Sequence, residues 1–356
     1  MRLKKTNDLS KVNPKRVGKG LLILFFCMSI GLYYQGCSKE GGTEKLDSQV
    51  SEPNLLIIAP ELESAIYLDG VYTGKTTPNS LLLEPGDYII GVGLKDSRNY
   101  LRRSVTITEK DNPVKVELNQ DDLQNPKKWK ALFIGINDVE TLDGGCSNHY
   151  STEELDLAFD YFKWSFEENV EDYSYNTMDW EFTRRDISDQ VVTLSSKNYL
   201  TPSMMESHLT DVKKGDFDLI VTFFKGSDQN CFDAGFLGLA WYNVTELDCN
   251  ASYFMVRYHE DIEDRIPYAK QNDPGVFIHE WLHTVAERFY PNKGIAVPQL
   301  DNGQVVHAAE KYGYKHPWMK WYKDIISGQV KDGYRYVGIG PDAWLDCSVR
   351  EGALSQ

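Results

Sequence analysis

The hydrophobic pattern of this chain changes near residue 118. Residues 53–118 consist of short apolar runs separated by turn signals, and they show no helical period of useful length. Asp69-Gly70, between apolar flanks, is a typical hairpin turn. The polar segment 119–128 follows, and helical and strand patterns alternate over 129–356. The sequence therefore predicts an α+β protein: a small N-terminal all-β sandwich domain, a linker that leaves the two parts separable, and an α+β domain.

Two runs in the β-rich segment indicate a known module. They read AIYLDGVYTGKTTP and LLLEPGDYIIGV, and through them residues 53–118 resemble the PEGA domain. The resemblance covers nearly all of the segment and implies a surface module without catalytic activity. The turn alone explains Asp69 and Gly70, so this segment contributes no candidate catalytic residue.

The N-terminus has the pattern of a signal peptide. Residues 1–19 hold seven Lys or Arg and one acidic residue, and the apolar run GLLILFFCMSIGLYY follows. This run is shorter than the about 20 residues that a membrane-spanning helix needs. Cys37, after Gly36, resembles a bacterial lipoprotein cleavage site, although Tyr34 and Gln35 depart from the usual pattern.

The chain is therefore predicted to be an exported bacterial lipoprotein. Residues 1–36 would be the signal peptide, and Cys37 would carry a lipid anchor at the membrane, in the periplasm or at the cell surface. Residues 37–52 are polar and without periodicity, as in a tether. An uncleaved signal anchor and ordinary signal-peptidase cleavage are the alternatives.

Charge and cysteine content narrow the class of protein. The formal net charge is −15, and removal of residues 1–36 leaves 31 basic and 52 acidic side chains, or −21. Such a chain lacks the basic face of a nucleic-acid-binding protein. Besides Cys27 and Cys37, the chain has four cysteines: Cys146, Cys231, Cys249 and Cys347. Export favours disulfide bonds, and four cysteines can pair in three ways; buried free thiols are the alternative. No C-x-x-C pair occurs, which argues against a zinc site made of cysteines.

A long helix is predicted to begin near residue 274. Asp273 supplies an N-cap acceptor and Pro274 suits the first helical position. No further proline occurs before Pro291, which leaves room for about four turns. One face of this helix is apolar, with Ile278, Leu282, Val285, Ala286 and Phe289.

The same helix carries His279, Glu280 and His283, an H-E-x-x-H arrangement. Residues four apart share a helix face, so both imidazoles can face one metal ion while Glu280 lies beside it. Zn²⁺ binds neutral imidazole and lowers the pKa of its water toward about 7, and a carboxylate can then move the proton to a leaving amine. The alternative is two ordinary histidines on a solvated surface helix.

A catalytic zinc site usually has three protein ligands. The extended metzincin pattern needs Gly at 286 and His at 289, whereas the chain has Ala286 and Phe289, which excludes that class in its standard form. The downstream candidates for the third ligand are Glu287, Asp301, His307, Glu310 and His316.

A second resemblance favours His307 among these candidates. HEWLH, a histidine shortly before YGY, and a WY-D segment are similar to an H-E-x-x-H zinc metallopeptidase-like domain of secreted bacterial proteins, over residues 279–324. The resemblance implies a zincin-like α+β domain with Zn²⁺ on three histidines and Glu280 as the catalytic residue. Asp301 stays open as a ligand or a supporting residue, and a Glu310 ligand would make the site thermolysin-like.

The predicted function is that of an exported zinc endopeptidase acting on protein or peptide substrates. A surface binding protein with an inactive metallopeptidase-like domain and a zinc hydrolase of a non-peptide bond are the alternatives. Tyr312 or Tyr314 is a candidate donor to an oxyanion and Met319 a candidate base beneath the metal, with core packing as the alternative for each. Residues 237–243 and 251–259 can pair as a hairpin, whose first strand would hold an extended substrate.

Overall fold

The computed structural model describes residues 52–108, 113–226, 236–242, 251–300 and 303–352. The predicted signal peptide, the lipid site at Cys37 and nearly all of the tether lie outside these residues, as does Asp301. Residues from Ser51 onward belong to one compact unit. No helix within the described ranges has the length and apolar character needed to span a bilayer.

The N-terminal part is a β sandwich of two sheets, ordered β4-β1-β7 and β3-β2-β5-β6. Leu55 of β1 and Val116 of β7 share one apolar core with Ile66 of β2 and Ile90 of β5, so the two sheets bury their inner faces against each other. The strands are β1 (Leu55–Ile58), β2 (Ala65–Leu68), β3 (Val71–Thr76), β4 (Asn79–Leu81), β5 (Gly86–Gly93), β6 (Tyr100–Ile107) and β7 (Val114–Glu117).

The Asp69-Gly70 turn joins β2 to β3 as the sequence predicts. Its two central residues have φ of 48° and 77°. Positive φ at both positions is the requirement of the two-residue hairpin turn, and Asp followed by Gly meets it at low steric cost. The predicted hairpin is confirmed.

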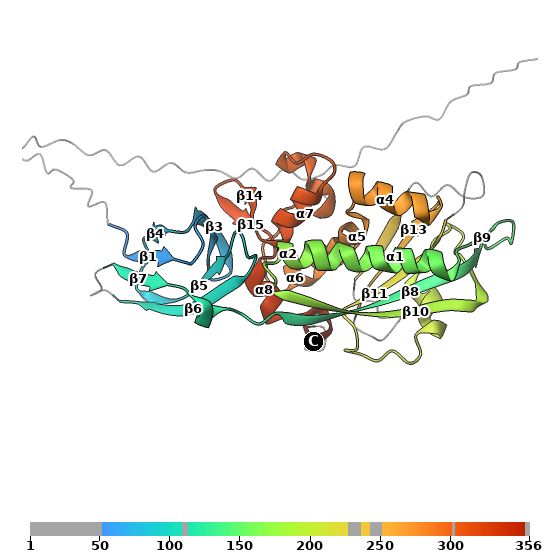
Figure 1. The fold of residues 1–356 in the computed structure, drawn as a ribbon, viewed down its shortest axis with the longest axis horizontal. Coiled ribbons are helices and arrows are strands. Elements are labelled where there is room, and N and C mark those ends of the chain that lie inside the picture. Colours follow the sequence, from blue (N-terminus) through green and yellow to red (C-terminus); the bar gives the residue numbers. More distant parts are fainter. Residues whose placement is uncertain (1–51, 109–112, 227–235, 243–250, 301–302, 353–356) are drawn as a thin grey trace, which may run out of the picture. The chain divides into compact units, whose positions relative to one another are not determined.

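The C-terminal part is built on a mixed sheet ordered β10-β8-β11-β13-β12 (Figure 1). Neighbouring strands are parallel except at one edge, where β12 runs antiparallel to β13, which confirms the predicted hairpin between 237–243 and 251–259. The strands are β8 (Lys127–Glu140), β9 (Ser147–His149, paired with β8), β10 (Met178–Thr193), β11 (Leu219–Lys225), β12 (Gly238–Trp241) and β13 (Ser252–Tyr258).

The central strands are apolar on both faces because each face of the sheet has its own core. Ala131 and Phe133 of β8 pack in the larger core with the helices, whereas Leu132 and Ile134 belong to a smaller core on the other side. This alternation follows from the two-residue period of a strand. The fold is therefore α+β with a β-rich N-terminal region, as predicted.

Helices and short turns complete the chain. The Ser151-x-x-Glu154 pattern in the sequence predicts a capping box, and the structure has it at the start of α1: Ser151 accepts from the Glu154 N–H, and the Glu154 carboxylate accepts from the Ser151 N–H. The helices are α1 (Thr152–Ser165), α2 (Glu171–Tyr173), α3 (Pro202–Met205), α4 (Ile262–Asn272), α5 (Val276–Thr284), α6 (Tyr290–Asn292), α7 (Met319–Ile326), α8 (Pro341–Asp346) and α9 (Val349–Gly352). The 3-10 turns are η1 (Gln120–Asp122), η3 (Glu206–His208), η6 (Val306–Ala308) and η7 (Glu310–Tyr312), the π turns are η2 (Phe166–Val170) and η5 (Val285–Phe289), and a small hairpin joins β14 (Val330–Asp332) to β15 (Arg335–Val337).

The histidine-bearing helix starts later than predicted. Asp273 ends α4 as its C-cap residue, and Gly275 is the N-cap of α5 without a side-chain cap bond, so the predicted Asp273 cap is wrong. The preceding helix α4 reaches Asn272 and leaves Asp273 no role in starting the next one. After Thr284 the helix widens into the π turn η5 and then continues as α6.

Two other predicted elements differ. The sequence pattern of residues 203–215 predicts a helix that ends at Gly215, but the helical part there is limited to α3 and η3, and residues 209–215 form turns, with Gly215 at φ 87°. Residues 180–186 and 191–195 each have the pattern of a separate strand, but the structure has one strand there, β10, whose pairing with β8 shifts register between Ile187 and Val191. A β-bulge allows a strand to continue through a polar stretch. Hydrophobic periodicity alone predicts that the strand ends there.

The predicted linker is folded against its neighbours. Asp122 of η1 is buried and receives two hydrogen bonds from the Arg103 guanidinium, at 2.7 and 2.6 Å. Further contacts join the β sandwich to the rest of the unit, since the Tyr67 hydroxyl donates to the Ser327 carbonyl at 2.8 Å and accepts from Gln329 at 2.8 Å. Whether the two parts fold separately stays a prediction.

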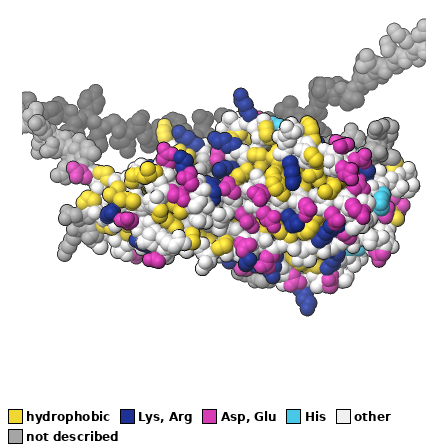
Figure 2. Space-filling view, in the orientation of Figure 1, with side chains coloured by type: hydrophobic (Ala, Val, Ile, Leu, Met, Phe, Trp, Pro, Cys, Tyr) yellow, Lys and Arg dark blue, Asp and Glu magenta, His cyan; other side chains and the backbone are white. Residues whose placement is uncertain are grey.

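Surface charge and cysteine state complete the description. Figure 2 shows acidic and basic side chains interspersed over the face that carries α1, without a large basic area on that face. Cys146 is disulfide-bonded and Cys347 is a free thiol. The remaining predicted disulfide positions, Cys231 and Cys249, lie outside the described residues.

Candidate metal centre

Three histidines converge on one point of the molecule. His279 and His283 lie one turn apart on α5, and His307 reaches them from the 3-10 turn η6. One ring nitrogen of each lies within 4.8 Å of the others, and the Nε2 atoms of His279 and His283 are 3.2 Å apart. Within the described part of the chain, this is the cluster of side chains that can hold a metal ion.

The spacing of His279 and His283 fits a tetrahedral zinc ion. Zn–N bonds of about 2.0–2.1 Å at tetrahedral angles place two ligand nitrogens about 3.3 Å apart. The observed 3.2 Å between the Nε2 atoms of His279 and His283 agrees with this value. Three histidines, the ligands that the described residues offer, are also the donor set of an open, catalytic type of site.

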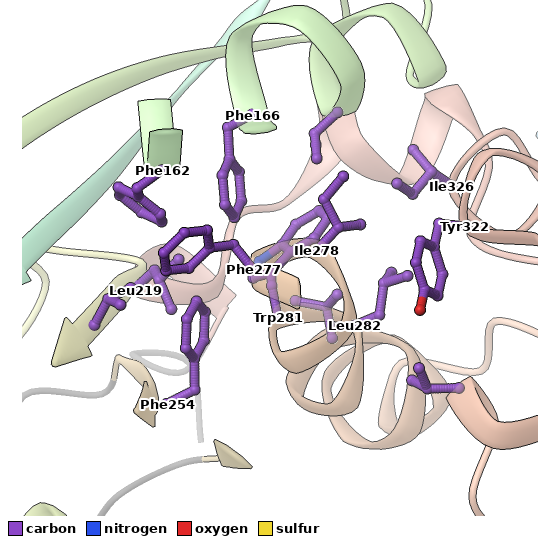
Figure 3. Packing of buried hydrophobic residues seen from close by; sticks show 14 of the residues in the cluster. Phe162, Phe166, Leu219, Phe254, Phe277, Ile278, Trp281, Leu282, Tyr322 and Ile326 are labelled. Atoms are coloured by element: carbon purple, nitrogen blue, oxygen red, sulfur yellow. The ribbon is translucent and has the colours of Figure 1, made fainter. Parts of the chain in front are cut away.

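The helix that carries His279 and His283 is not a solvated surface helix. Phe277, Ile278, Trp281 and Leu282 are fully buried, and Figure 3 shows them directed at α1, the sheet and α7. A helix that is apolar on most of its circumference belongs in a core. The two histidines therefore occupy the small sector of α5 that is left open to the cavity.

His279 is held by a hydrogen bond on its other ring nitrogen. The Tyr322 hydroxyl of α7 lies 2.9 Å from His279 Nδ1. Burial, with the neighbouring His283 and His307 rings, lowers the pKa of His279 well below its ordinary value. A neutral ring is the form that binds metals, and a partner on Nδ1 leaves Nε2 as the ligand atom.

Glu287 contacts the second ring nitrogen of His283, as Tyr322 does for His279, and it also contacts the segment that carries His307. Its Oε2 lies 3.0 Å from His283 Nδ1, and its Oε1 accepts from the Val306 N–H at 3.1 Å. Val306 precedes His307, whose pKa is lowered by burial and by the nearby His283. Glu287, one of the candidate third ligands, is thus placed to orient two histidines, with both carboxylate oxygens engaged.

Glu280 lies beside the three histidines and is almost completely buried, with 6% of its surface exposed. Burial raises its pKa to about 7, with a further increase from Glu287 and an opposing effect of His283. Gly238 of β12 makes this position possible, because a Cβ there would lie 2.6 Å from the Glu280 carboxyl carbon. The carboxylate therefore lies directly against the edge strand.

The histidines and Glu280 line a cavity of about 580 Å³. Residues of β12 and α5 form part of its wall, and Trp318 forms another part, with its ring stacked on His279 at 6.0 Å between centroids. Its described lining also includes Tyr242, Asp273, Arg288, Gln304 and His316.

The other sequence candidates lie elsewhere or have other partners. Glu310 accepts from the Trp318 indole N–H at 2.9 Å, and His316 lies 3.3 Å from Asp273, so neither joins the cluster. The Tyr314 hydroxyl donates to Asp324 at 2.6 Å. Neither Tyr312, Tyr314 nor Met319 lines the cavity, and all three pack against the larger core.

The sequence did not assign the roles of Tyr322, Gly238 and Trp318. Tyr322 belongs to the WY-D segment already noted for its resemblance, which was the one signal for it. Gly238 and Trp318 carry no signal of their own, because their importance depends on which side chain the fold brings against them.

Comparisons with known proteins add little to this geometry. No family model matches the sequence, and no curated protein matches it. Among solved structures, the fold has a weak likeness to the crystal structure of metalloproteinase-II from Bacteroides fragilis. The match has 11% identity and a TM-score of 0.20, and it covers 57% of this chain and 69% of that one.

Proposed function

We propose that this protein is a zinc-dependent endopeptidase. The observation that carries the proposal is the convergence of His279, His283 and His307 beside a buried glutamate in one cavity. When bound, zinc would lower the pKa of a coordinated water and polarise the carbonyl group of the bond to be cleaved.

Glu280 would be the general base and then the general acid. It would take a proton from the attacking water and deliver it to the leaving amine. A pKa of about 7 suits both steps, because a group that titrates near the working pH can accept and return a proton. An inactive binding protein would have no use for a carboxyl group whose burial opposes ionisation.

The edge of β12 favours a peptide over other substrates. Among the described strands, β12 pairs with β13 on one side and with none on the other. An extended peptide can add to such an edge through main-chain hydrogen bonds, which places its backbone along the cavity. This preference distinguishes an endopeptidase from a zinc hydrolase of a non-peptide bond.

The paired test compares the wild-type protein with Glu280→Gln. We expect about one zinc per chain in both, because Glu280 is not one of the three ligands. Cleavage of an unstructured protein substrate should fall roughly 10²–10⁴-fold in the variant, the range for loss of a general base. A variant that keeps its zinc and cleaves at the wild-type rate would end the assignment, and so would wild-type protein without zinc or cleavage.

The location of this activity is a further part of the proposal. The N-terminal pattern supports export, with a lipid on Cys37 and a membrane anchor. Residues 53–118 would then be a PEGA-like surface module next to the peptidase. Metabolic labelling with a radioactive fatty acid would test the anchor, and a Cys37→Ser variant that still incorporates label would contradict it.

A further inference from the structure

The π turn η5 changes which side chains of the histidine helix face the cavity. Its hydrogen bond from the Tyr290 N–H to the Val285 carbonyl spans five residues instead of four. In a regular α-helix, Arg288 would lie about 140° around the axis from His283, at about 100° per residue. The wider turn reduces this rotation, and Arg288 lines the same cavity as His283.

Among the residues that the structure describes, Arg288 is the cationic group of this cavity without an ion-pair or hydrogen-bond partner. Its side chain is exposed, and it makes no ion pair or hydrogen bond within the described part of the chain. The acidic groups of the cavity are already engaged: Glu287 holds His283, and Asp273 lies 3.3 Å from His316. Glu280 is buried against Gly238.

Arg288 lies at a distance from the metal cluster that corresponds to about two residues of an extended substrate. It follows His283 by five residues, which is about 7 Å along a helix axis. Tyr242, just after β12, packs its ring on Phe289 at 6.2 Å between centroids, so the end of the edge strand lies beside the π turn. An extended peptide rises about 3.3 Å per residue. In a peptide bound along β12, the side chain that reaches Arg288 would therefore belong to a residue roughly two positions from the one at the metal cluster.

We infer that Arg288 binds a carboxylate of the substrate and makes this site selective for acidic peptides. The inference rests on the proposed function and names its substrate class. A guanidinium presents a planar pair of N–H donors that matches both oxygens of a carboxylate, which gives orientation as well as attraction. The carboxylate has two possible sources, an Asp or Glu side chain within a longer peptide and the C-terminal carboxylate of a shorter one.

The first measurement defines where the wild-type protein cleaves. A peptide library digested by the zinc-loaded protein should show Asp or Glu enriched about two residues to one side of the cleaved bond, or cleavage about two residues from a free C-terminus. Absence of any cleavage would contradict the proposed function itself. Cleavage without a carboxylate preference would overturn the inference on Arg288 alone.

The second measurement reads binding without turnover. In the Glu280→Gln background, fluorescent peptides from that library carry Glu or Gln at the enriched position, each with a free or an amidated C-terminus. We expect the peptide with the preferred carboxylate to bind about tenfold more tightly than its neutral partner, and the preference to weaken at high salt. The free and amidated forms show which source of carboxylate is used.

Arg288→Gln and Arg335→Gln complete the test. Arg335, of β15, is exposed and does not line the cavity, so its replacement makes the same change of net charge elsewhere. Arg288→Gln should abolish the preference for the carboxylate while leaving zinc content and binding of the neutral peptide unchanged. If the preference survives in Arg288→Gln, or is lost equally in Arg335→Gln, the inference is wrong.

Discussion

At the residue scale, the geometry of the candidate metal centre depends on the hydrogen-bond partners of the histidines as well as on the histidines themselves. Tyr322 occupies the second ring nitrogen of His279, and Glu287 occupies that of His283. Such partners fix the tautomer and the orientation of a metal-binding ring, and their loss commonly costs 10–100-fold in metal affinity. Within the described part of the chain, His307 has no hydrogen-bond partner on a ring nitrogen, and it is the most exposed of the three.

His307 is therefore the ligand whose assignment most needs a direct test. We expect His307→Ala to lower zinc content well below one per chain, since two imidazoles alone would hold the ion weakly. His149→Ala is the matched control, because His149 is an exposed histidine that lies 2.8 Å from Asp138 and outside the cluster. Elemental analysis of both variants, with Glu310→Ala beside them, decides the matter. Full zinc in His307→Ala with loss in Glu310→Ala would make the site thermolysin-like.

The sequence predicts the ligand residues better than their surroundings. The four-residue spacing of His279 and His283 needs nothing but a helix to bring them together. His307 could be favoured over Glu310 through the resemblance alone, because it follows His283 by 24 residues and no helical spacing relates the two. The role of Glu287 depends on the Val306 N–H, a tertiary contact that no local pattern reveals.

At the scale of elements, the contact between α5 and β12 determines where the Glu280 carboxyl group lies. Gly238 is the point of closest approach, and a side chain there would overlap the Glu280 carboxyl group. The two elements are brought together by the sheet order and not by local sequence. The same holds for the start of α5, where the local Asp-Pro signal was overridden by the end of α4.

Gly238→Ala should consequently damage catalysis more than it damages metal binding. The added methyl group would lie 2.6 Å from three atoms of the Glu280 side chain, so that side chain must move. We expect at least a tenfold loss of turnover with zinc content kept, and a loss of stability of about 1–3 kcal/mol, the usual cost of overpacking. Gly86→Ala is the control, because its new methyl group would meet its nearest neighbour at 3.6 Å. Normal turnover in Gly238→Ala would contradict the close packing seen here.

At the scale of the whole molecule, buried carboxyl groups make stability depend on pH. Burial raises the pKa of Glu171 to about 7, Asp179 and Glu167 raise it further, and the Trp180 N–H and Lys128 oppose the rise. Between about 4.5 and 7 the folded state thus binds more protons than the unfolded state at this site. The free energy of unfolding must fall as the pH rises through this window.

Glu171→Gln should flatten that dependence. The variant cannot ionise, and its amide oxygen can still accept from the Trp180 N–H, which donates to Glu171 at 2.8 Å. Urea unfolding at pH 5 and pH 8 should show a smaller difference between the two conditions in Glu171→Gln than in the wild type. Glu153→Gln, a change at an exposed position in the first turn of α1, serves as the control. An unchanged difference in Glu171→Gln would exclude Glu171 as its source.

The two parts of the unit are joined by contacts that a polar linker does not suggest. The Tyr67 hydroxyl of the β sandwich is buried between the Ser327 carbonyl, at the end of α7, and the Gln329 amide. α7 is also the helix that carries Tyr322, the partner of His279. The β sandwich therefore contacts the end of the helix whose Tyr322 contacts His279 of the candidate metal centre. This holds whether or not each part can fold alone.

Tyr67→Phe isolates this connection by removing one oxygen atom. The change leaves the Ser327 carbonyl without its buried donor, while the Gln329 amide still donates to the Tyr175 hydroxyl. We expect a loss of about 1–3 kcal/mol in the free energy of unfolding. Tyr88→Phe is the matched control, because the Tyr88 hydroxyl donates to the Glu84 carbonyl at an exposed position and should cost less than about 0.5 kcal/mol. Calorimetry of both variants measures the thermal unfolding of the whole chain, so it shows whether the two parts unfold in one transition or in two. If the parts are coupled, Tyr67→Phe lowers the midpoint of a single transition that includes the C-terminal α+β part. If that part melts at its wild-type temperature in Tyr67→Phe, the contact does not stabilise it and the two parts are separable as the sequence predicts.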